Sequence, residues 1–206
     1  MTSVAILDYG SGNIHSATRA AAATGADVTV TSDSAVALAA DGLIVPGVGA
    51  FAACMEQLHA IGGDDIIRTR CERGRPVFGI CVGHQILFSR GVEHGIETDG
   101  VGVFPGVIDR LPTERLPHMG WNTIAPDPAA SLLAQVRGER FYFVHSYAAL
   151  DASDAPADAA LTWCEHEDVS FIAAVEWGVV TSTQFHPEKS GVAGAALLRA
   201  WVDGLR

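Results

Sequence analysis

The chain has 206 residues, of which 49% are hydrophobic and 18% charged, a composition typical of a folded globular protein and not of a disordered one. Its formal net charge of −11 argues against a nucleic-acid partner, because such a partner requires a basic surface. It contains no run of about 18 apolar residues, so we expect no membrane span. Its start lacks the basic and long apolar stretches of a secretion signal, so we expect no such signal and a cytoplasmic location. The length predicts a single domain over residues 1–206.

The first half of the chain alternates short apolar runs with helix-like segments. Such alternation is typical of an α/β fold, in which helices cover a parallel sheet. The carboxyl ends of parallel strands meet at one edge, where open sheets of this kind place their active sites. The expected elements are strands over residues 4–7, 28–30, 43–45 and 76–78, and helices over residues 14–24, 51–61 and 85–88.

The second half has fewer helix signals and more strand signals. An acidic segment over residues 151–160 is predicted to be a surface loop. We therefore expect an open, largely parallel mixed sheet with helices on both faces and an additional antiparallel β layer in the C-terminal half. The expected elements are strands over residues 101–108 and 141–144, a hairpin over residues 173–183, and a final helix over residues 192–205.

Residues 79–83, Gly-Ile-Cys-Val-Gly, are the most informative segment, because they join a predicted strand to a predicted helix. A nucleophile on such a sharp turn is exposed at the sheet edge, and the flanking glycines allow strand and helix to approach closely. A helix N-terminus would favour the thiolate of Cys81, which is the form that attacks carbonyl carbons. Taken alone, the segment also fits a buried structural cysteine between glycines.

A second polar cluster follows the apolar run 179–183. His186 and Glu188 are two residues apart, so in an extended chain their side chains point to the same side. A carboxylate beside an imidazole can hold one tautomer and stabilise the imidazolium that forms when the histidine takes a thiol proton. Taken alone, the pair also fits a histidine at a strand end beside a solvated glutamate. Together with Cys81, it indicates a Cys-His-Glu catalytic triad.

Acyl transfer through a tetrahedral intermediate requires two N–H donors aimed at the developing oxyanion. The backbone N–H of Val82, directly after the nucleophile, is one candidate. A loop of Gly47, Val48 and Gly49 follows the predicted strand 43–45 and could supply the other donor after rotation of a peptide, although a plain β-turn also fits. The cysteines and histidines lack zinc-binding spacing, so we expect no zinc site. The sequence shows no sign of any other metal or of an organic cofactor, so we expect neither.

Taken together, these segments resemble the class I, triad-type glutamine amidotransferases over essentially the whole chain. Residues 79–85 are similar to the nucleophile motif of that family, and residues 185–188 to its His/Glu motif. Four further segments, residues 8–13, 46–51, 117–122 and 142–147, are similar to the glutaminase subunits of imidazole glycerol phosphate synthases, from histidine biosynthesis. Two positions depart from the commoner residues of that subfamily, namely His84 in place of methionine and Gly191 in place of glutamine.

The resemblance implies that Cys81 attacks the side-chain amide of L-glutamine, with His186 as the base and Glu188 as its orienting carboxylate. It implies an oxyanion hole formed by Val82 and the loop of Gly47, Val48 and Gly49, and a heterodimer with a (β/α)₈ cyclase subunit that takes up the ammonia. The residues implied to bind glutamine are Gln85, Glu93, Ser146 and Tyr147. The residues implied to face the cyclase are Asn13, Pro117, His118, Met119, Trp121 and Lys189.

Several alternatives remain open at this point. Glu93 also fits a solvated acid in a loop over residues 90–95, and Met119 and Trp121 also fit core positions. The whole chain also fits an amidotransferase subunit of another pathway, such as anthranilate or pyridoxal phosphate synthesis. A free-standing cysteine hydrolase on the same fold would need no partner.

Overall fold

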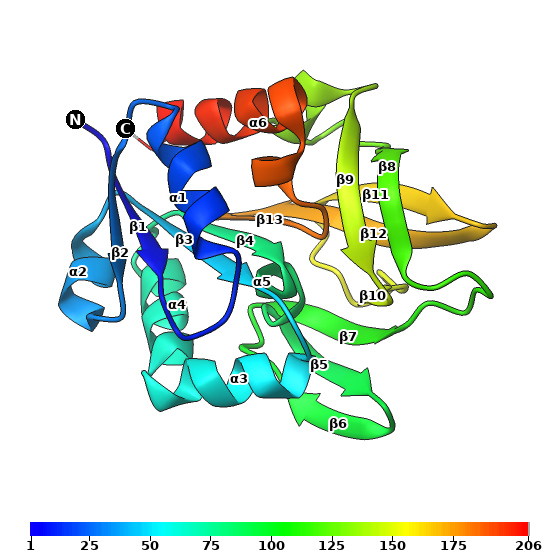
Figure 1. Cartoon of the computed structure of the whole chain (residues 1–206). Helices are drawn as coiled ribbons and strands as arrows, with labels where there is room; N and C mark the ends of the chain where they lie inside the picture. Colours follow the sequence, from blue (N-terminus) through cyan, green and yellow to red (C-terminus); the bar gives the residue numbers. More distant parts are fainter. Residues whose placement is uncertain (206) are drawn as a thin grey trace.

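Residues 1–205 of the computed structural model are described, and they form three β-sheets with helices packed around the largest (Figure 1). The strands from β13 to β2 of that sheet run parallel, while β12 and β11 pair antiparallel at one end. This confirms the predicted mixed, largely parallel sheet. In spatial order the sheet comprises β11 (Ala160–His166), β12 (Val169–Trp177), β13 (Val180–Thr183), β4 (Val77–Cys81), β3 (Gly42–Gly47), β1 (Ser3–Leu7) and β2 (Asp27–Thr31).

Helices cover both faces of the parallel part of this sheet. In Figure 1, α1 and α6 lie above it and pack together, whereas α3 and α4 lie below it. The helical elements are α1 (Ile14–Ala22), α2 (Ser34–Ala39), α3 (Phe51–Ala60), α4 (Gly63–Glu72), α5 (Val82–Gln85) and α6 (Gly191–Asp203), with 3-10 turns η1 (Leu133–Val136) and η2 (Pro187–Lys189).

The predicted additional β layer is present as two smaller sheets on the right of Figure 1. They pair antiparallel except for β5 and β7, which run parallel. The first sheet orders β10 (Tyr147–Ala149), β7 (Phe104–Arg110), β5 (Phe88–Glu93) and β6 (Ile96–Asp99), and the second pairs β8 (His118–Thr123) with β9 (Arg140–His145).

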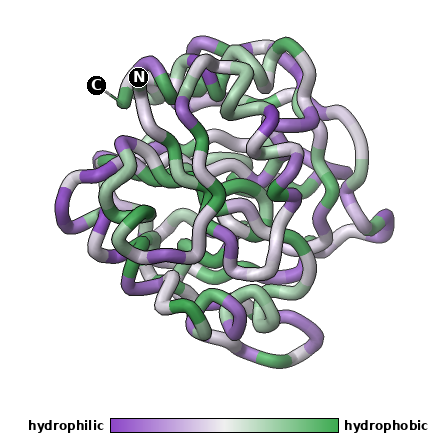
Figure 2. The backbone as a smooth tube through the Cα atoms, turned by 60° about the vertical axis from the view of Figure 1, so that its left-hand side comes forward, coloured by the Kyte–Doolittle hydropathy of each residue, from purple (hydrophilic) through white to green (hydrophobic). Residues whose placement is uncertain are grey.

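The buried apolar side chains form a continuous core between the sheet and its helices. Figure 2 shows hydrophobic segments concentrated in the interior and hydrophilic ones mostly in the peripheral turns. Within residues 1–205, no helix has the length and apolar character that crossing a membrane would require.

The predicted helix over residues 85–88 is wrong. The helix α5 is a single turn that ends at Gln85, and Phe88 already begins β5. The carbonyls of Ile86 and Leu87 accept hydrogen bonds from the N–H groups of Val101 and Phe104, at 2.7 and 2.9 Å. Pairing with a distant part of the chain therefore ends the helix despite its apolar sequence. Helices α2 and α4 were not predicted at all.

Candidate active site

A pocket of about 360 Å³ opens at the carboxyl ends of β3 and β4, beside the corner between β9 and β10. It gathers most of the predicted site residues, from segments that are far apart in the chain. The predicted residues that line it are Val48, Gly49, Cys81, Val82, Gln85, Glu93, Pro117, Ser146, Tyr147, His186 and Lys189. Those outside its lining are Asn13, Gly47, His118, Met119, Trp121 and Glu188.

Cys81 lies on a sharp turn between β4 and α5. Its backbone has φ 57° and ψ −112°, a conformation that a non-glycine residue rarely adopts and that costs on the order of 1–3 kcal/mol. The two flanking glycines are required sterically. A Cβ at Gly79 would lie 2.6 Å from the carbonyl oxygen of Gly83, and one at Gly83 would collide with the carbonyl of Val45. The two glycines thus allow the strained turn that places Cys81 in the pocket lining.

His186 reaches the same pocket because β13 runs parallel to β4, with Thr183 opposite Ile80. Its backbone is extended, with φ −104° and ψ 91°, and the following Pro187 opens the 3-10 turn η2. This turn, not a continued strand, brings the Glu188 carboxylate back to the ring: Nδ1 of His186 lies 2.8 Å from Oε1 of Glu188. The two side chains therefore meet as predicted, but through a turn.

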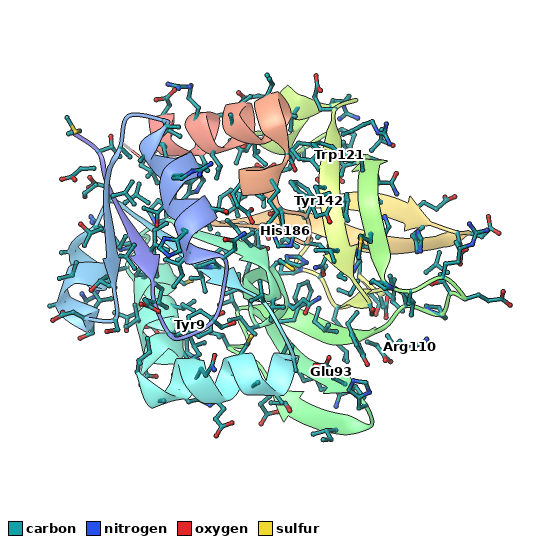
Figure 3. All side chains as sticks on the ribbon, viewed as in Figure 1. Tyr9, Glu93, Arg110, Trp121, Tyr142 and His186 are labelled. Carbon is teal, nitrogen blue, oxygen red and sulfur yellow. The ribbon has the colours of Figure 1, made fainter. Side chains whose placement is uncertain are left out.

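Both side chains of this pair are only 2% exposed, so the interaction is shielded from solvent. Burial lowers the pKa of His186, but hydrogen bonds and charge from Cys81 and Glu188 outweigh it and raise that pKa to about 9. The Nδ1–H donates to Glu188, so Nε2 is the nitrogen left for a proton transfer. His186 is labelled near the centre of Figure 3, at the end of the parallel strands. Such a histidine can accept a proton and hold the resulting imidazolium.

In the loop predicted to complete an oxyanion hole, the backbone N–H and carbonyl of Val48 are both engaged by other groups. The N–H of Val48 donates to Oγ of Ser11 at 3.2 Å. The carbonyl of Val48 accepts from the same Ser11 hydroxyl at 2.7 Å and from the Cys54 thiol at 3.3 Å. Gly47 is held close to α5, since a Cβ there would lie 2.6 Å from the N of Gly83. In this conformation the Val48 N–H is directed to Ser11 and not to the pocket.

Gln85 binds protein groups with its amide nitrogen, which donates to the Tyr147 carbonyl at 2.8 Å and to Oε1 of Gln184 at 2.9 Å. The Gln184 amide in turn lies 3.9 Å from the Cys81 sulfur. Glu93 is not a solvated acid in a loop: its Oε2 accepts the N–H of Phe51 at the start of α3, at 2.7 Å. It therefore forms part of the pocket wall.

The residues predicted to face a partner divide into exposed and buried ones. Met119 and Trp121 project from β8 with 61% and 48% of their surfaces exposed, so they are not core residues. Pro117 and Lys189 lie exposed at the pocket rim. His118 is different: it is only 4% exposed and its ring contacts His145, so it does not reach the surface.

Three site residues were missed by sequence reasoning. Gln184 precedes His186 by two residues, a spacing that could have placed both on one face of the chain. Ser190 donates to the His186 carbonyl at 2.6 Å and accepts the N–H of Tyr142 at 3.0 Å, which ties the turn to β9. Ser11 gave no signal of its own, because its partner Val48 is 37 residues away.

Comparisons with known proteins agree with this geometry. Residues 5–203 match the family described as "Glutamine amidotransferase class-I". Two relatives named "Imidazole glycerol phosphate synthase subunit HisH" are 60% and 55% identical to this chain, from Nocardia farcinica and Mycobacterium tuberculosis, and each match covers 98% of both chains. A solved structure titled "Crystal structure of glutamine amidotransferase" is 19% identical over 98% of both chains with a TM-score of 0.76.

Proposed function

The chain belongs to the class I glutamine amidotransferases, as a glutamine amidotransferase subunit of imidazole glycerol phosphate synthase in histidine biosynthesis, and we propose that it hydrolyses L-glutamine with a triad of Cys81, His186 and Glu188. The observation that carries this proposal is the 2.8 Å contact between His186 and Glu188, beside a strained Cys81 in the same pocket. The relatives' names give the family role, and the geometry supports the assignment of residues.

In the proposed reaction, Sγ of Cys81 attacks the side-chain amide carbon of glutamine while Nε2 of His186 takes the thiol proton. Glu188 stabilises the imidazolium that forms. The tetrahedral intermediate then collapses: its C–N bond breaks, His186 gives its proton to the leaving nitrogen, and ammonia departs. Water, deprotonated by His186, attacks the glutamyl thioester, releases glutamate and restores the thiol.

The pocket offers complementary groups to the head of the substrate. The Glu93 carboxylate, held in place by the N–H of Phe51, would attract the ammonium group of glutamine. Backbone groups of Ser146 and Tyr147 would bind its carboxylate, and Gln85 would contribute through its side-chain oxygen, since its nitrogen is already engaged. The side-chain amide of glutamine would then extend towards Cys81.

We further propose that the oxyanion hole is incomplete in the conformation described. Val82 would supply one N–H, but the N–H of Val48 donates to Ser11 instead. Rotation of the peptide between Gly47 and Val48 would free this donor and aim it at the oxyanion. Because one missing donor typically costs about 10²–10³ in rate, the isolated chain should hydrolyse glutamine slowly.

The proposed partner is a (β/α)₈ cyclase subunit that takes up the ammonia and joins it to a phosphoribulosyl aminoimidazole carboxamide. The products are imidazole glycerol phosphate and aminoimidazole carboxamide ribotide. Met119 and Trp121 support the position of the interface on β8, because exposed methionine and tryptophan are enriched in interface cores. Pro117, Lys189 and Asn13 would extend it around the pocket rim. The reduced cysteines fit a cytoplasmic location.

The test is glutamate release from L-glutamine by the purified chain under three conditions: alone, with the cyclase subunit, and with the cyclase and its phosphoribulosyl ligand. Strong activity only in the third condition is expected. High activity of the chain alone, unchanged by the cyclase, would favour a free-standing cysteine hydrolase. Activation by another synthase subunit in place of the cyclase would move the protein to another pathway.

A further inference from the structure

The corner between β9 and β10 is held by a side chain outside the proposed triad. Strand β9 ends at His145 and β10 begins at Tyr147, so the chain passes from one sheet to another at Ser146. Nδ1 of His145 lies 3.0 Å from the Tyr147 carbonyl oxygen, and Gln85 donates to the same oxygen at 2.8 Å. Two donors therefore fix the direction of this carbonyl, at the residues proposed to bind the glutamine carboxylate.

The direction of every hydrogen bond behind this corner follows from chemistry. A carbonyl oxygen can only accept, so Nδ1 of His145 carries the hydrogen and its Nε2 has the lone pair. That lone pair faces Nδ1 of His118 at 3.0 Å, which must then donate. The remaining Nε2 of His118 accepts from the side-chain nitrogen of Asn122 at 3.3 Å. The second hydrogen of that nitrogen is bound by the carbonyl of Glu165, at 2.8 Å.

This assignment requires both histidines to be neutral, and their surroundings favour that form. They are 4% and 7% exposed. Burial, reinforced by neighbouring histidines, lowers the pKa of His118 to about 4 and that of His145 to about 3. His166 stacks on His118 with ring centroids 4.3 Å apart and binds the Arg115 carbonyl. Among residues 1–205, no three His, Cys, Asp or Glu side chains are grouped so as to hold a metal ion.

We propose that Asn122, His118 and His145 form a one-directional hydrogen-bond relay that positions the glutamine-binding corner and links it to β8. The proposal rests on the proposed function, because it assumes that Ser146 and Tyr147 bind glutamine. The three are positioning residues, since they act through the Tyr147 carbonyl. Strand β8 carries the relay residues His118 and Asn122 together with the exposed Met119 and Trp121. A partner bound to β8 would therefore contact the strand that holds the Asn122 end of the relay.

Removing the middle of the relay should weaken substrate binding. In His118→Leu, Nε2 of His145 loses its donor, and the ring is free to move its hydrogen to that nitrogen. The lone pair of Nδ1 would then face the Tyr147 carbonyl, and the corner would shift. We expect the KM for glutamine of the cyclase complex to rise about tenfold, as the loss of one buried hydrogen bond implies, with kcat within about twofold of wild type.

Two matched variants separate the relay from simple packing. In His118→Asn, the amide nitrogen can replace Nδ1 as a donor, so KM should return to within about threefold of wild type. In Phe143→Leu, a ring that stacks on His118 at 4.9 Å is trimmed while every relay atom remains, so KM should stay near wild type. An unchanged KM in His118→Leu, or an equal rise in Phe143→Leu, would overturn the proposal.

A second measurement does not depend on catalysis. Imidazole ¹⁵N chemical shifts of the wild-type chain should show that His145 and His118 are both protonated at Nδ1 and unprotonated at Nε2. In His118→Leu, His145 should no longer be held in this tautomer. The opposite tautomer of His145 in the wild type would refute the relay. A wild-type complex that releases no glutamate would defeat the proposed function while these shifts still decide the direction of the relay.

Discussion

Two groups of buried histidines, His186 on one hand and His118 with His145 on the other, lie at or beside the pocket, and the pKa values of their rings are shifted in opposite directions. His186 has the Glu188 carboxylate and the Cys81 thiol as neighbours, and its pKa is raised to about 9 although burial alone lowers it. The hydrogen-bond partners of His145 are a carbonyl and a second imidazole, and burial lowers its pKa to about 3. Burial is similar in both, so the partners decide whether the ring is charged.

The difference indicates a division of labour. A histidine that exchanges protons needs a neighbour that stabilises its charged form, and Glu188 provides this. A histidine that fixes the direction of a carbonyl must stay in one neutral tautomer, and an apolar pocket with aligned hydrogen bonds provides that.

The largest effect is expected from removing the proposed nucleophile. Cys81→Ala should lower glutamate release by the cyclase complex on the order of 10⁴-fold or more, because alanine has no thiol to form the proposed thioester. Cys164→Ala is the matched control: this cysteine is also 4% exposed, but it lies outside the pocket. Both variants should bind the cyclase as wild type does. Full activity of Cys81→Ala would remove this thiol from the mechanism.

The second-largest effect is expected from removing the carboxylate beside His186, which leaves this ring, like His145, without a charged hydrogen-bond partner. Glu188→Gln leaves a neutral amide beside Nδ1, which no longer stabilises the imidazolium or selects one tautomer. We expect kcat for glutamate release to fall by roughly 10²–10⁴-fold with little change in KM. Glu97→Gln is the control, since Glu97 pairs with Arg90 on the exposed hairpin. A loss confined to KM would mean that Glu188 acts in substrate binding.

The sequence predicted the proposed triad because its geometry depends on local features. Cys81 ends β4 and His186 lies three residues beyond the end of β13, and the parallel pairing of these two strands brings their carboxyl ends together. The glycines around Cys81 are also local evidence, since their close contacts with Val45 and with each other require them. The centre of the parallel sheet was predictable for the same reason, because β1, β3 and β4 are apolar runs between turns.

The relay was not predictable, because it depends on register and on side-chain rotamers. His118 and His145 meet only because β8 and β9 pair with these two residues directly opposite. A shift of one residue would turn His118 outward and Met119 inward, and the sequence of β8 has no simple alternation that fixes this choice. Sequence reasoning therefore assigned His118 to the partner surface, where Met119 and Trp121 of the same strand are exposed, whereas His118 is buried. The helix α5 was misjudged for a related reason, since distant backbone groups end it.

The two histidine groups also predict opposite effects of pH on stability. Burial lowers the pKa values of His84, His118 and His145 to about 3, 4 and 3, whereas an unfolded histidine titrates near 6.5. The unfolded chain therefore binds more protons below pH 6.5, and the free energy of unfolding should fall by roughly 1.4 kcal/mol per pH unit for each such residue. For His186 the sign is reversed: its contribution is complete below pH 6.5 and is lost as the pH rises through about 9.

Urea unfolding of the isolated chain at pH 7 and 5.5 measures this dependence. His118→Asn removes one of the three buried titrating rings, so the loss of stability between the two pH values should be smaller than in wild type. His15→Asn, at an exposed position, should leave it unchanged. If the two variants show the same pH dependence, the buried ring at position 118 does not titrate as described.

The smallest effect concerns Ser11, a buried hydroxyl that faces neither histidine group and holds the Val48 peptide instead. Ser11→Ala removes the acceptor of the Val48 N–H, which belongs to the peptide between Gly47 and Val48, and so lowers the cost of turning that N–H to the pocket. A neutral hydrogen bond is worth about 0.5–1.5 kcal/mol, so glutamate release by the isolated chain should rise about 2–10-fold. The fully loaded cyclase complex, in which the proposed rotation would already have occurred, should change little. Ser3→Ala, whose hydroxyl binds Asp41, is the control. A fall in the basal rate of Ser11→Ala would mean that Ser11 supports the active loop and does not restrain it.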